Sequence, residues 1–311
     1  MEAVINAALP VFALILAGYL AARFEILGHA ATDSINRFVV YLALPALLFQ
    51  AMATLAVSQL ANLHFLLAFG GGMLITFGLS FTLQRRGGQS LTDAGIEGLA
   101  AGYANTGFLG IPLCLALFGR ESLPPVIIAT LLTACLLFAI VIVMIEVDRH
   151  GRGDFGHALG KVSLTLLRNP LLVAPVLGMI FAATGLPLPL PVDRFAVLLG
   201  NAASPCALVA IGLFLAQQSG GHDNRAVLRL VLIKLLLHPA ITAVLAYWIF
   251  PMPRLWAQVA VVLSALPIGT GPFMLAKLYD REAALTSRAI LISTLCSVVS
   301  VSLLIVWLAK P

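Results

Sequence analysis

Apolar runs long enough to cross a bilayer follow one another along almost the whole chain. Of the 311 residues, 61% are hydrophobic and 10% are charged, and the mean hydropathy is +1.04. Soluble domains carry roughly a quarter charged residues, whereas a membrane-spanning helix needs about 20 mostly apolar ones. The sequence therefore predicts an all-α polytopic membrane protein.

The polar residues between these runs predict ten transmembrane helices. The longest polar insertion, residues 146–161, separates five predicted spans from five, which divides the chain into residues 1–150 and 151–311. The first run starts beside Glu2 and lacks a positively charged leader, so we interpret it as a span rather than a signal peptide. The predicted spans are 4–22, 35–54, 61–83, 94–118, 123–147, 166–184, 192–217, 227–250, 255–278 and 284–308.

The basic residues predict the orientation in the membrane. Thirteen of the 18 Lys and Arg residues fall in loops or helix ends on one side, four fall on the other, and Lys234 lies within a span. The basic-rich side is expected to be cytoplasmic, which places both termini on the non-cytoplasmic side of a cell membrane. The net charge of +5 is thereby explained without a nucleic-acid partner. The cysteines lie inside apolar runs, which favours packing thiols over disulfides or metal ligands.

Helix-altering residues recur at one spacing in the two halves. Each pair is 160 residues apart and falls at equivalent places in the first, second or fourth span of its half. A repeat of five spans enters the membrane from opposite sides in its two copies, so the pattern predicts inverted repeats, as in secondary transporters. The pairs are Pro10 and Pro170, Gly18 and Gly178, Pro45 and Pro205, and Pro112 and Pro272.

Spans 4 and 9 each contain a stretch that is expected to interrupt the helix. The stretches are "NTGFLGIP" at 105–112 and "ALPIGTGP" at 265–272. Proline removes a hydrogen-bond donor, and glycine permits backbone conformations that other residues avoid. We expect Pro112 and Pro272 to open second half-helices, and the two interruptions to cross antiparallel.

Such interruptions leave backbone amides free at membrane depth, which is tolerated where they line a cavity. Helix N-termini attract anions, and neither stretch contains Arg or Lys, so dipoles and amides would hold the ligand. The alternative is a pair of proline kinks that serve packing alone. The residues predicted to bind substrate are Asn105, Thr106, Gly107, Gly110, Ile111, Pro112, Pro267, Gly269, Thr270, Gly271 and Pro272.

Three motifs resemble those of the auxin efflux carrier family. They are "INRFVVYLALPALLF" in span 2, "NTGFLGIPL" in span 4 and "ALPIGTGPFMLAKLY" in span 9. The resemblance extends from about residue 10 to residue 307. It implies a fold like that of bile-acid/sodium symporters, with spans 1, 2, 6 and 7 as a dimerising scaffold. Spans 3–5 and 8–10 would form an elevator-like transport domain.

In this family an asparagine of span 4 and the crossover prolines line a carboxylate site. The matching positions are Asn105, Pro112, Pro267 and Pro272. The second half has Ala265 where the first has Asn105, so the two interruptions are not equivalent. The short loop after span 5 resembles bacterial members rather than the plant carriers with long loops.

Lys234 and His238 lie one turn apart in span 8, where ionisable groups suggest function. His238 is a candidate for proton coupling. It is also open to a simpler interpretation, in which the neutral ring bonds a carbonyl freed by Pro239 and Lys234 extends toward the inner surface. Glu97, early in span 4, is a candidate partner for Lys234.

Three functions remain open from the sequence. The leading one is a secondary transporter of small organic anions, malonate-like, malate-like or auxin-like, that is a homodimer surrounded by lipid and needs no cofactor beyond H⁺ or Na⁺. The second is a sodium-coupled symporter of bile-acid type. An intramembrane enzyme or a receptor ranks lowest, since the chain lacks H-E-x-x-H and its aspartates lie at span ends.

Overall fold

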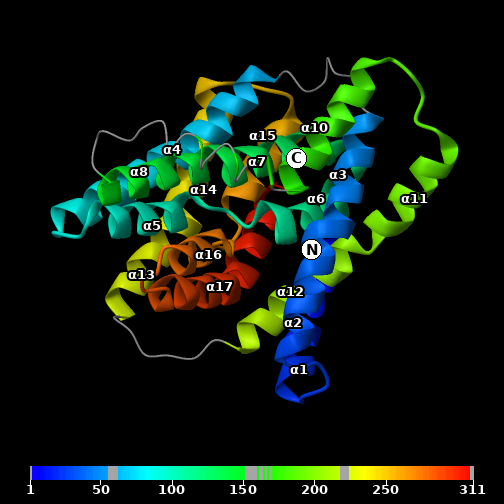
Figure 1. Ribbon diagram of the computed structural model, residues 1–311. Helices are drawn as coiled ribbons and strands as arrows, with labels where there is room; N and C mark the ends of the chain where they lie inside the picture. The colour runs from blue at the N-terminus through cyan, green and yellow to red at the C-terminus, as the bar shows by residue number, and fades with distance from the viewer. Residues whose placement is uncertain are drawn as a thin grey trace. The chain divides into compact units, whose positions relative to one another are not determined.

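The described part of the chain is helical. The computed structural model describes residues 2–54, 62–150, 170–217 and 224–308, with the single positions 160, 164, 167 and 168. These residues form helices and one isolated antiparallel bridge, between Ala104 and Ile268 (Figure 1). The predicted all-α class is confirmed for this part of the chain. Most of the polar insertion at 146–161 lies outside the described residues.

Six helices are long and apolar enough to cross a membrane, as expected for a polytopic membrane protein. They overlap predicted spans 2, 3, 5, 7, 8 and 10. Four shorter apolar helices overlap predicted spans 1, 4, 6 and 9. Ten crossings therefore remain a prediction. The six long helices are Ala30–Ala53, Leu63–Arg86, Arg120–Asp148, Leu190–Ala216, Asn224–Ile249 and Ala284–Leu308.

The chain divides into two compact units. Unit 1 comprises residues 1–62, 107–128 and 167–218, and unit 2 comprises 63–106, 129–166 and 219–311. The helix that starts with the short 3₁₀ turn η4 (Arg120–Ser122) continues from unit 1 into unit 2 through α7 (Leu123–Leu131). Unit 1 further contains α1 (Glu2–Arg23), α2 (His29–Phe38), η1 (Val39–Ala43), α3 (Leu44–Ala53), α6 (Ile111–Phe118), α10 (Pro170–Ala183), α11 (Leu190–Asn201) and α12 (Ala203–Ala216).

Two helix pairs in unit 1 pack closely at glycines. Helix α1 lies along α12, and α3 lies along α10. A Cβ atom at Gly18 would lie 2.3 Å from the Val209 carbonyl oxygen, and one at Gly178 would lie 2.6 Å from the Phe49 carbonyl oxygen. Only glycine fits such contacts without a shift of backbone.

The two helix pairs also make contacts at positions that are related by a shift of 160 residues. A Cβ at Gly212 would lie 2.9 Å from the Gly18 carbonyl carbon, and one at Gly178 would lie 2.8 Å from the Met52 Cβ. Gly178 is 160 residues after Gly18, and Gly212 is 160 residues after Met52. One packing contact therefore occurs twice in unit 1, at positions related by the spacing of the prolines.

Unit 2 is built around α4. Helix α4 packs on α5, α14 and α15, and α5 packs in turn on α8 and α16. Phe65 and Phe69 of α4 stack with ring centroids 5.8 Å apart, and Trp256 of α15 meets the Phe65 ring edge-on. The elements are α4 (Leu63–Arg86), α5 (Leu91–Gly102), η5 (Leu132–Leu137), α8 (Phe138–His150), α13 (Asn224–Leu232), η6 (Ile233–Leu237), α14 (His238–Val244), η7 (Leu245–Ile249), α15 (Arg254–Ser264), α16 (Gly271–Leu278) and α17 (Ala284–Leu308).

Three π-helical turns each end two residues before a proline in a helix that continues. They are η1 before Pro45, η3 (Thr106–Gly110) before Pro112, and η6 before Pro239. A proline cannot donate to the carbonyl one turn back, but a π turn pairs each carbonyl five residues ahead and can bypass the missing donor. These prolines therefore change the local hydrogen bonding without ending the helix.

Candidate functional site

The first interruption is short. Helix α5 ends at Gly102, Tyr103 adopts an extended conformation with φ −87° and ψ 93°, and a new helix begins at Thr106. It runs through η3 into α6 as one apolar helix, Thr106–Phe118. The expectation that Pro112 opens the half-helix is wrong, because the π turn accommodates Pro112 inside a helix that has already begun.

The second interruption is longer and matches its prediction. Helix α15 ends at Ser264, and α16 begins only at Gly271, so residues 265–270 lie between helices. Pro272 is the second residue of α16, where its missing donor costs nothing. The predicted Pro267, Gly269 and Thr270 all lie in the interruption itself.

The two interrupted segments meet within unit 2 as a short antiparallel ladder. The Asn105 amide donates to the Pro267 carbonyl at 3.0 Å, and the Gly269 amide donates to the Tyr103 carbonyl at 3.1 Å. Ala104 and Ile268 lie opposite each other between these bonds. The ladder satisfies buried backbone groups that lie outside any helix, as a membrane interior requires.

Tyr103 explains two of the glycines. A Cβ at Gly269 would lie 2.8 Å from the Tyr103 ring, and one at Gly271 would lie 2.6 Å from it. Neither Gly269 nor Gly271 has a positive φ, unlike Gly88, Gly119 and Gly185 among the described residues. The glycines of the second interruption therefore serve close packing rather than an unusual backbone conformation, which corrects the expected role.

Several polar groups beside the ladder have no protein partner among the described residues. They are the Asn105 side-chain amide and the backbone amides of Thr270 and Gly271. Asn105 is 7% exposed, and a Cβ at Gly269 would lie 3.3 Å from its Cα atom. Gly271 is the first residue of α16, and backbone amides at the start of a helix are suited to an anion.

The second interruption is supported by Ser293 of α17, which sequence reasoning missed. Its hydroxyl oxygen accepts the Ile268 amide at 3.1 Å, and the hydroxyl donates to the Ile290 carbonyl at 3.1 Å. Serine is common in spanning helices, so no local signal separates this one from its neighbours. Tyr103 had such a signal, since it stands directly before the "ANTG" stretch.

The remaining predicted site residues fall in unit 1. Gly107 and Gly110 are part of the π turn η3, and Ile111 and Pro112 begin α6. Ile111 and Pro112 are buried. Their part in a binding site stays a prediction.

The ionisable candidates are arranged differently from the prediction. Glu97 accepts hydrogen bonds from Gln84 and Gln89 and lies 3.7 Å from the Arg229 guanidinium. The Lys234 ammonium instead donates to the Ser264 carbonyl at 2.6 Å. The expected Glu97–Lys234 pair is therefore wrong. Fully buried, Lys234 also does not extend to the inner surface.

The simpler interpretation of His238 also fails. His238 is fully buried, but neither ring nitrogen has a hydrogen-bond partner among the described residues. The π turn before Pro239 rearranges the carbonyls that the proline was expected to free. The imidazole therefore does not form the expected bond to one of them.

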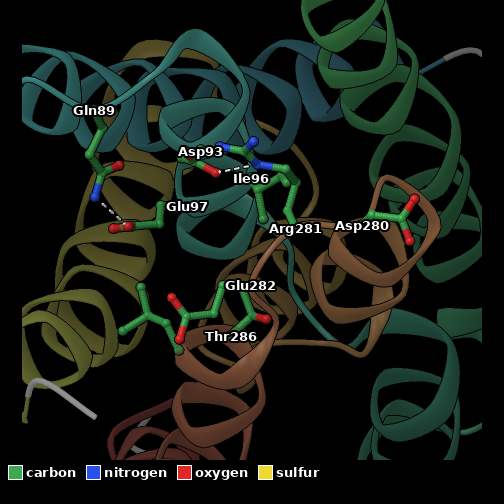
Figure 2. Close-up of a pocket in the computed structure, with 9 residues that line it drawn as sticks. Gln89, Asp93, Ile96, Glu97, Asp280, Arg281, Glu282 and Thr286 are labelled. Carbon is green, nitrogen blue, oxygen red and sulfur yellow. Dashed lines mark hydrogen bonds and ion pairs between the residues drawn. The ribbon is translucent and has the colours of Figure 1, made fainter.

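A cavity of about 420 Å³ opens in unit 2 near the start of α5 (Figure 2). The Arg281 guanidinium pairs with Asp93, with Nε 2.8 Å from Oδ1, and Gln89 points toward Glu97. The hydrogen bond from Arg281 lowers the pKa of Asp93 below its ordinary value. Asp280 and Glu282 add two more carboxylates to the lining. With four carboxylates and one guanidinium, the cavity is poorly suited to an organic anion.

The six long apolar helices are those of a polytopic membrane protein. A family model described as "Membrane transport protein" matches residues 3–305, and the chain belongs to this family. The resemblance to auxin efflux carriers is thereby confirmed, and the chain is a membrane transporter rather than an enzyme.

Similar proteins come from bacteria, plants and archaea. The chain is 30% identical to a Rhizobium meliloti protein named "Putative malonate transporter", over 97% of this chain and 95% of the relative. It is 24% identical to "Auxin efflux carrier component 8" of Arabidopsis thaliana, over 94% of each chain. An "Uncharacterized transporter" of Methanothermobacter thermautotrophicus is 28% identical over 95% of each.

Proposed function

We propose that the protein is a secondary transporter of small organic anions, with a mono- or dicarboxylate bound beside the ladder of the two interrupted segments. The observation that carries the proposal is the set of unpartnered donors there, namely the Asn105 side chain and the amides of Thr270 and Gly271. The name of the Rhizobium meliloti relative makes malonate the first substrate to test, and the plant relative adds auxin-like acids.

Carboxylate binding follows from the chemistry of these donors. Hydrogen bonds to an ionised acceptor are shorter and stronger than neutral ones, and the start of α16 adds a positive dipole end. No Lys or Arg occurs in either interrupted stretch. Binding without a fixed counter-charge is weaker and favours release, which a transport cycle requires. Within unit 2 the proposed site includes Thr106, which follows Asn105 in the chain.

Two observations support an inverted repeat. The packing contact of Gly18 with Gly212 recurs as that of Gly178 with Met52, at positions 160 residues apart. The interrupted segments, whose prolines have the same spacing, pair antiparallel. We propose ten spans in two inverted sets of five, with both termini on the non-cytoplasmic side of the cell membrane.

We further propose an elevator mechanism with a dimerising scaffold. Predicted spans 1, 2, 6 and 7 fall in unit 1, and spans 3, 8, 9 and 10 fall in unit 2. Residues 107–128, from spans 4 and 5, group with unit 1. The scaffold and transport domains of the proposal therefore follow the units, apart from this segment.

Reconstituted transport tests the proposal. The purified protein is reconstituted into liposomes that contain unlabelled malonate. Exchange of this malonate for external labelled malonate, malate or indole-3-acetate is then measured. At least one of these carboxylates is expected to exchange. Failure of every carboxylate tested would remove the proposed function. Replacement of sodium by potassium separates the bile-acid-type alternative, because sodium-coupled uptake would then stop.

A further inference from the structure

A buried polar strip runs along the helix that contains α13, η6, α14 and η7. It consists of Lys234, His238 and Thr242, which are spaced four residues apart and so lie on one face over successive turns. The side chains of all three are fully buried. Ionisable groups buried in a spanning helix are rare and carry a functional expectation.

The strip has very few hydrogen bonds. Lys234 donates to the Ser264 carbonyl. Both ring nitrogens of His238 and the hydroxyl of Thr242 have no partner among the described residues. Buried polar atoms are normally paired, so the unpaired atoms of His238 and Thr242 are an unusual feature of this helix. The π turn that holds Lys234 is a further feature common at functional sites.

Apolar groups and close backbone cover the strip on the side of α4. The Phe69 ring lies 6.3 Å from the His238 ring, between centroids. A Cβ at Gly72 would lie 2.2 Å from the Thr242 hydroxyl oxygen, so glycine is required there. This explains part of the Gly70–Gly72 run by close packing.

The charged groups of the surrounding helices are engaged elsewhere. Asp93 and Glu97 of α5 pair with Arg281 and Arg229. Among the described residues no carboxylate forms an ion pair with Lys234 or His238. The other titratable side chains on the helices packed against the strip are His64, Arg85 and Arg86 of α4, Tyr247 of η7, Arg254 of α15, Arg288 and Cys296 of α17, and Arg225 of α13.

Two cations one turn apart without a counter-charge repel each other strongly in a low-dielectric interior. Lys234 and His238 are therefore not expected to carry a positive charge at the same time. Proton transfer within the pair breaks an N–H bond at Lys234 and forms one at His238, and it leaves the charge of the pair unchanged. Release to bulk water lowers the charge by one.

We propose that Lys234, His238 and Thr242 form the proton-coupling site of the transporter. This rests on the proposed function and adds its coupling ion. The link to the substrate site is the Ser264 carbonyl, because Ser264 is the last residue of α15 before the second interruption. A charge on Lys234 stabilises that helix end, and its movement to His238 changes the field beside the ladder. The same charge disfavours sodium at this position.

The experiment separates the two proposals with two measurements on the same liposomes. Malonate exchange at equal pH on both sides reports the proposed function. A trapped pH dye reports protons that move with net malonate uptake. In the wild type both signals are expected. His238→Gln is expected to abolish most of the proton movement per malonate, because it removes the ring that accepts the proton.

Matched variants guard against a general loss of folding. His64→Gln changes a histidine of α4 that lies outside the strip and contacts the Pro251 carbonyl, and it is expected to leave both signals unchanged. Thr242→Val has nearly the same shape and lacks the hydroxyl, so a lower ratio of protons to malonate is expected. If His238→Gln does not fold, the ratio of protons to malonate in Thr242→Val tests the proposal in its place.

Each outcome has one consequence. Exchange without any proton movement in the wild type would overturn this inference and leave the proposed function intact. A normal proton ratio in folded His238→Gln or, in its place, Thr242→Val would do the same. Absence of exchange for every carboxylate would overturn both proposals together.

Discussion

The backbone amide of Asn105 donates a 3.0 Å hydrogen bond to the carbonyl of Pro267, a residue 162 positions further along the chain. This bond uses the main chain of Asn105 and leaves its side chain free. It also holds the first interruption against the second, where the backbone groups of both segments have no hydrogen-bond partner within a helix. The substrate site that we propose depends on this arrangement.

Asn105→Ala is expected to weaken carboxylate binding about 10-fold to 100-fold, since a hydrogen bond to a charged group contributes roughly 1.5–3 kcal/mol. Folding should be little affected, because the ladder uses only backbone atoms of Asn105. Malonate affinity is measured by isothermal titration or from the concentration dependence of exchange. Gln258→Ala, which removes another amide of unit 2, is the control. Equal affinity in Asn105→Ala and wild type would remove Asn105 from the site.

Gly269→Ala is expected to destabilise the protein by about 1–3 kcal/mol, because the new methyl group would overlap the Tyr103 ring. Tyr103→Leu in the same chain should restore part of the loss. The thermal unfolding of the two single variants and the double variant gives the interaction energy. Gly78→Ala has no atom within 4 Å of the added Cβ and serves as the control. Additive effects would contradict the proposed contact.

Ser293→Ala is expected to cost about 1–3 kcal/mol of stability, since it leaves the buried Ile268 amide without an acceptor. Ser302→Ala changes a partly exposed serine on the same helix, α17, and should have a much smaller effect. Thermal unfolding in detergent measures both. A similar loss in the two variants would mean that Ser293 does not specifically support the interruption.

Gly18→Ala and Gly178→Ala are expected to destabilise to a similar extent, about 1–3 kcal/mol each, because both added methyl groups meet a backbone carbonyl. Gly28→Ala, with open space around the added atom, is the control. The unfolding temperatures of the three variants test whether the two contacts contribute equally to stability. A tolerated alanine at only one of the two positions would argue against equivalence.

Asp93→Asn is expected to lower stability at neutral pH and to have no effect in strong acid. The Arg281 hydrogen bond holds the folded-state pKa of Asp93 below its ordinary value of 3.8, so the stabilisation is present above pH 3.8 and is lost as the pH falls through the folded-state pKa. The pair is about one-third exposed, so added salt should weaken the effect. Unfolding temperatures of variant and wild type across pH check this. A difference that persists below both pKa values would contradict it.

Local chemistry made the interruptions predictable. Proline and glycine act on the hydrogen bonds of their own turn, so a cluster of them in an apolar run predicts an irregular backbone wherever it occurs. The same reasoning misplaced the start of the first half-helix. A π turn can pass a proline, and the sequence around Pro112 does not distinguish that outcome from a helix that begins there.

Side-chain contacts between residues that are distant in the chain were harder to predict from the sequence. The sequence predicts Glu97 as a partner of Lys234, but in the structure Glu97 pairs with Arg229 and Lys234 donates to the Ser264 carbonyl. Depth along a helix follows from residue number, whereas the direction in which a side chain points depends on how neighbouring helices are rotated. The lack of a partner for His238 among the described residues could not be predicted for the same reason.

The amino-acid sequence by itself determined the membrane class, the apolar helices, the two interrupted stretches and the family. Each of these depends on hydropathy, on residues adjacent in the chain or on motif similarity. Only the tertiary structure decided that Asn105 lies opposite Pro267, that Tyr103 requires glycine at 269 and 271, and that Lys234 bonds Ser264. These contacts join segments separated by 30 to more than 160 residues, and close packing, which selects them, leaves no periodic signal in the chain.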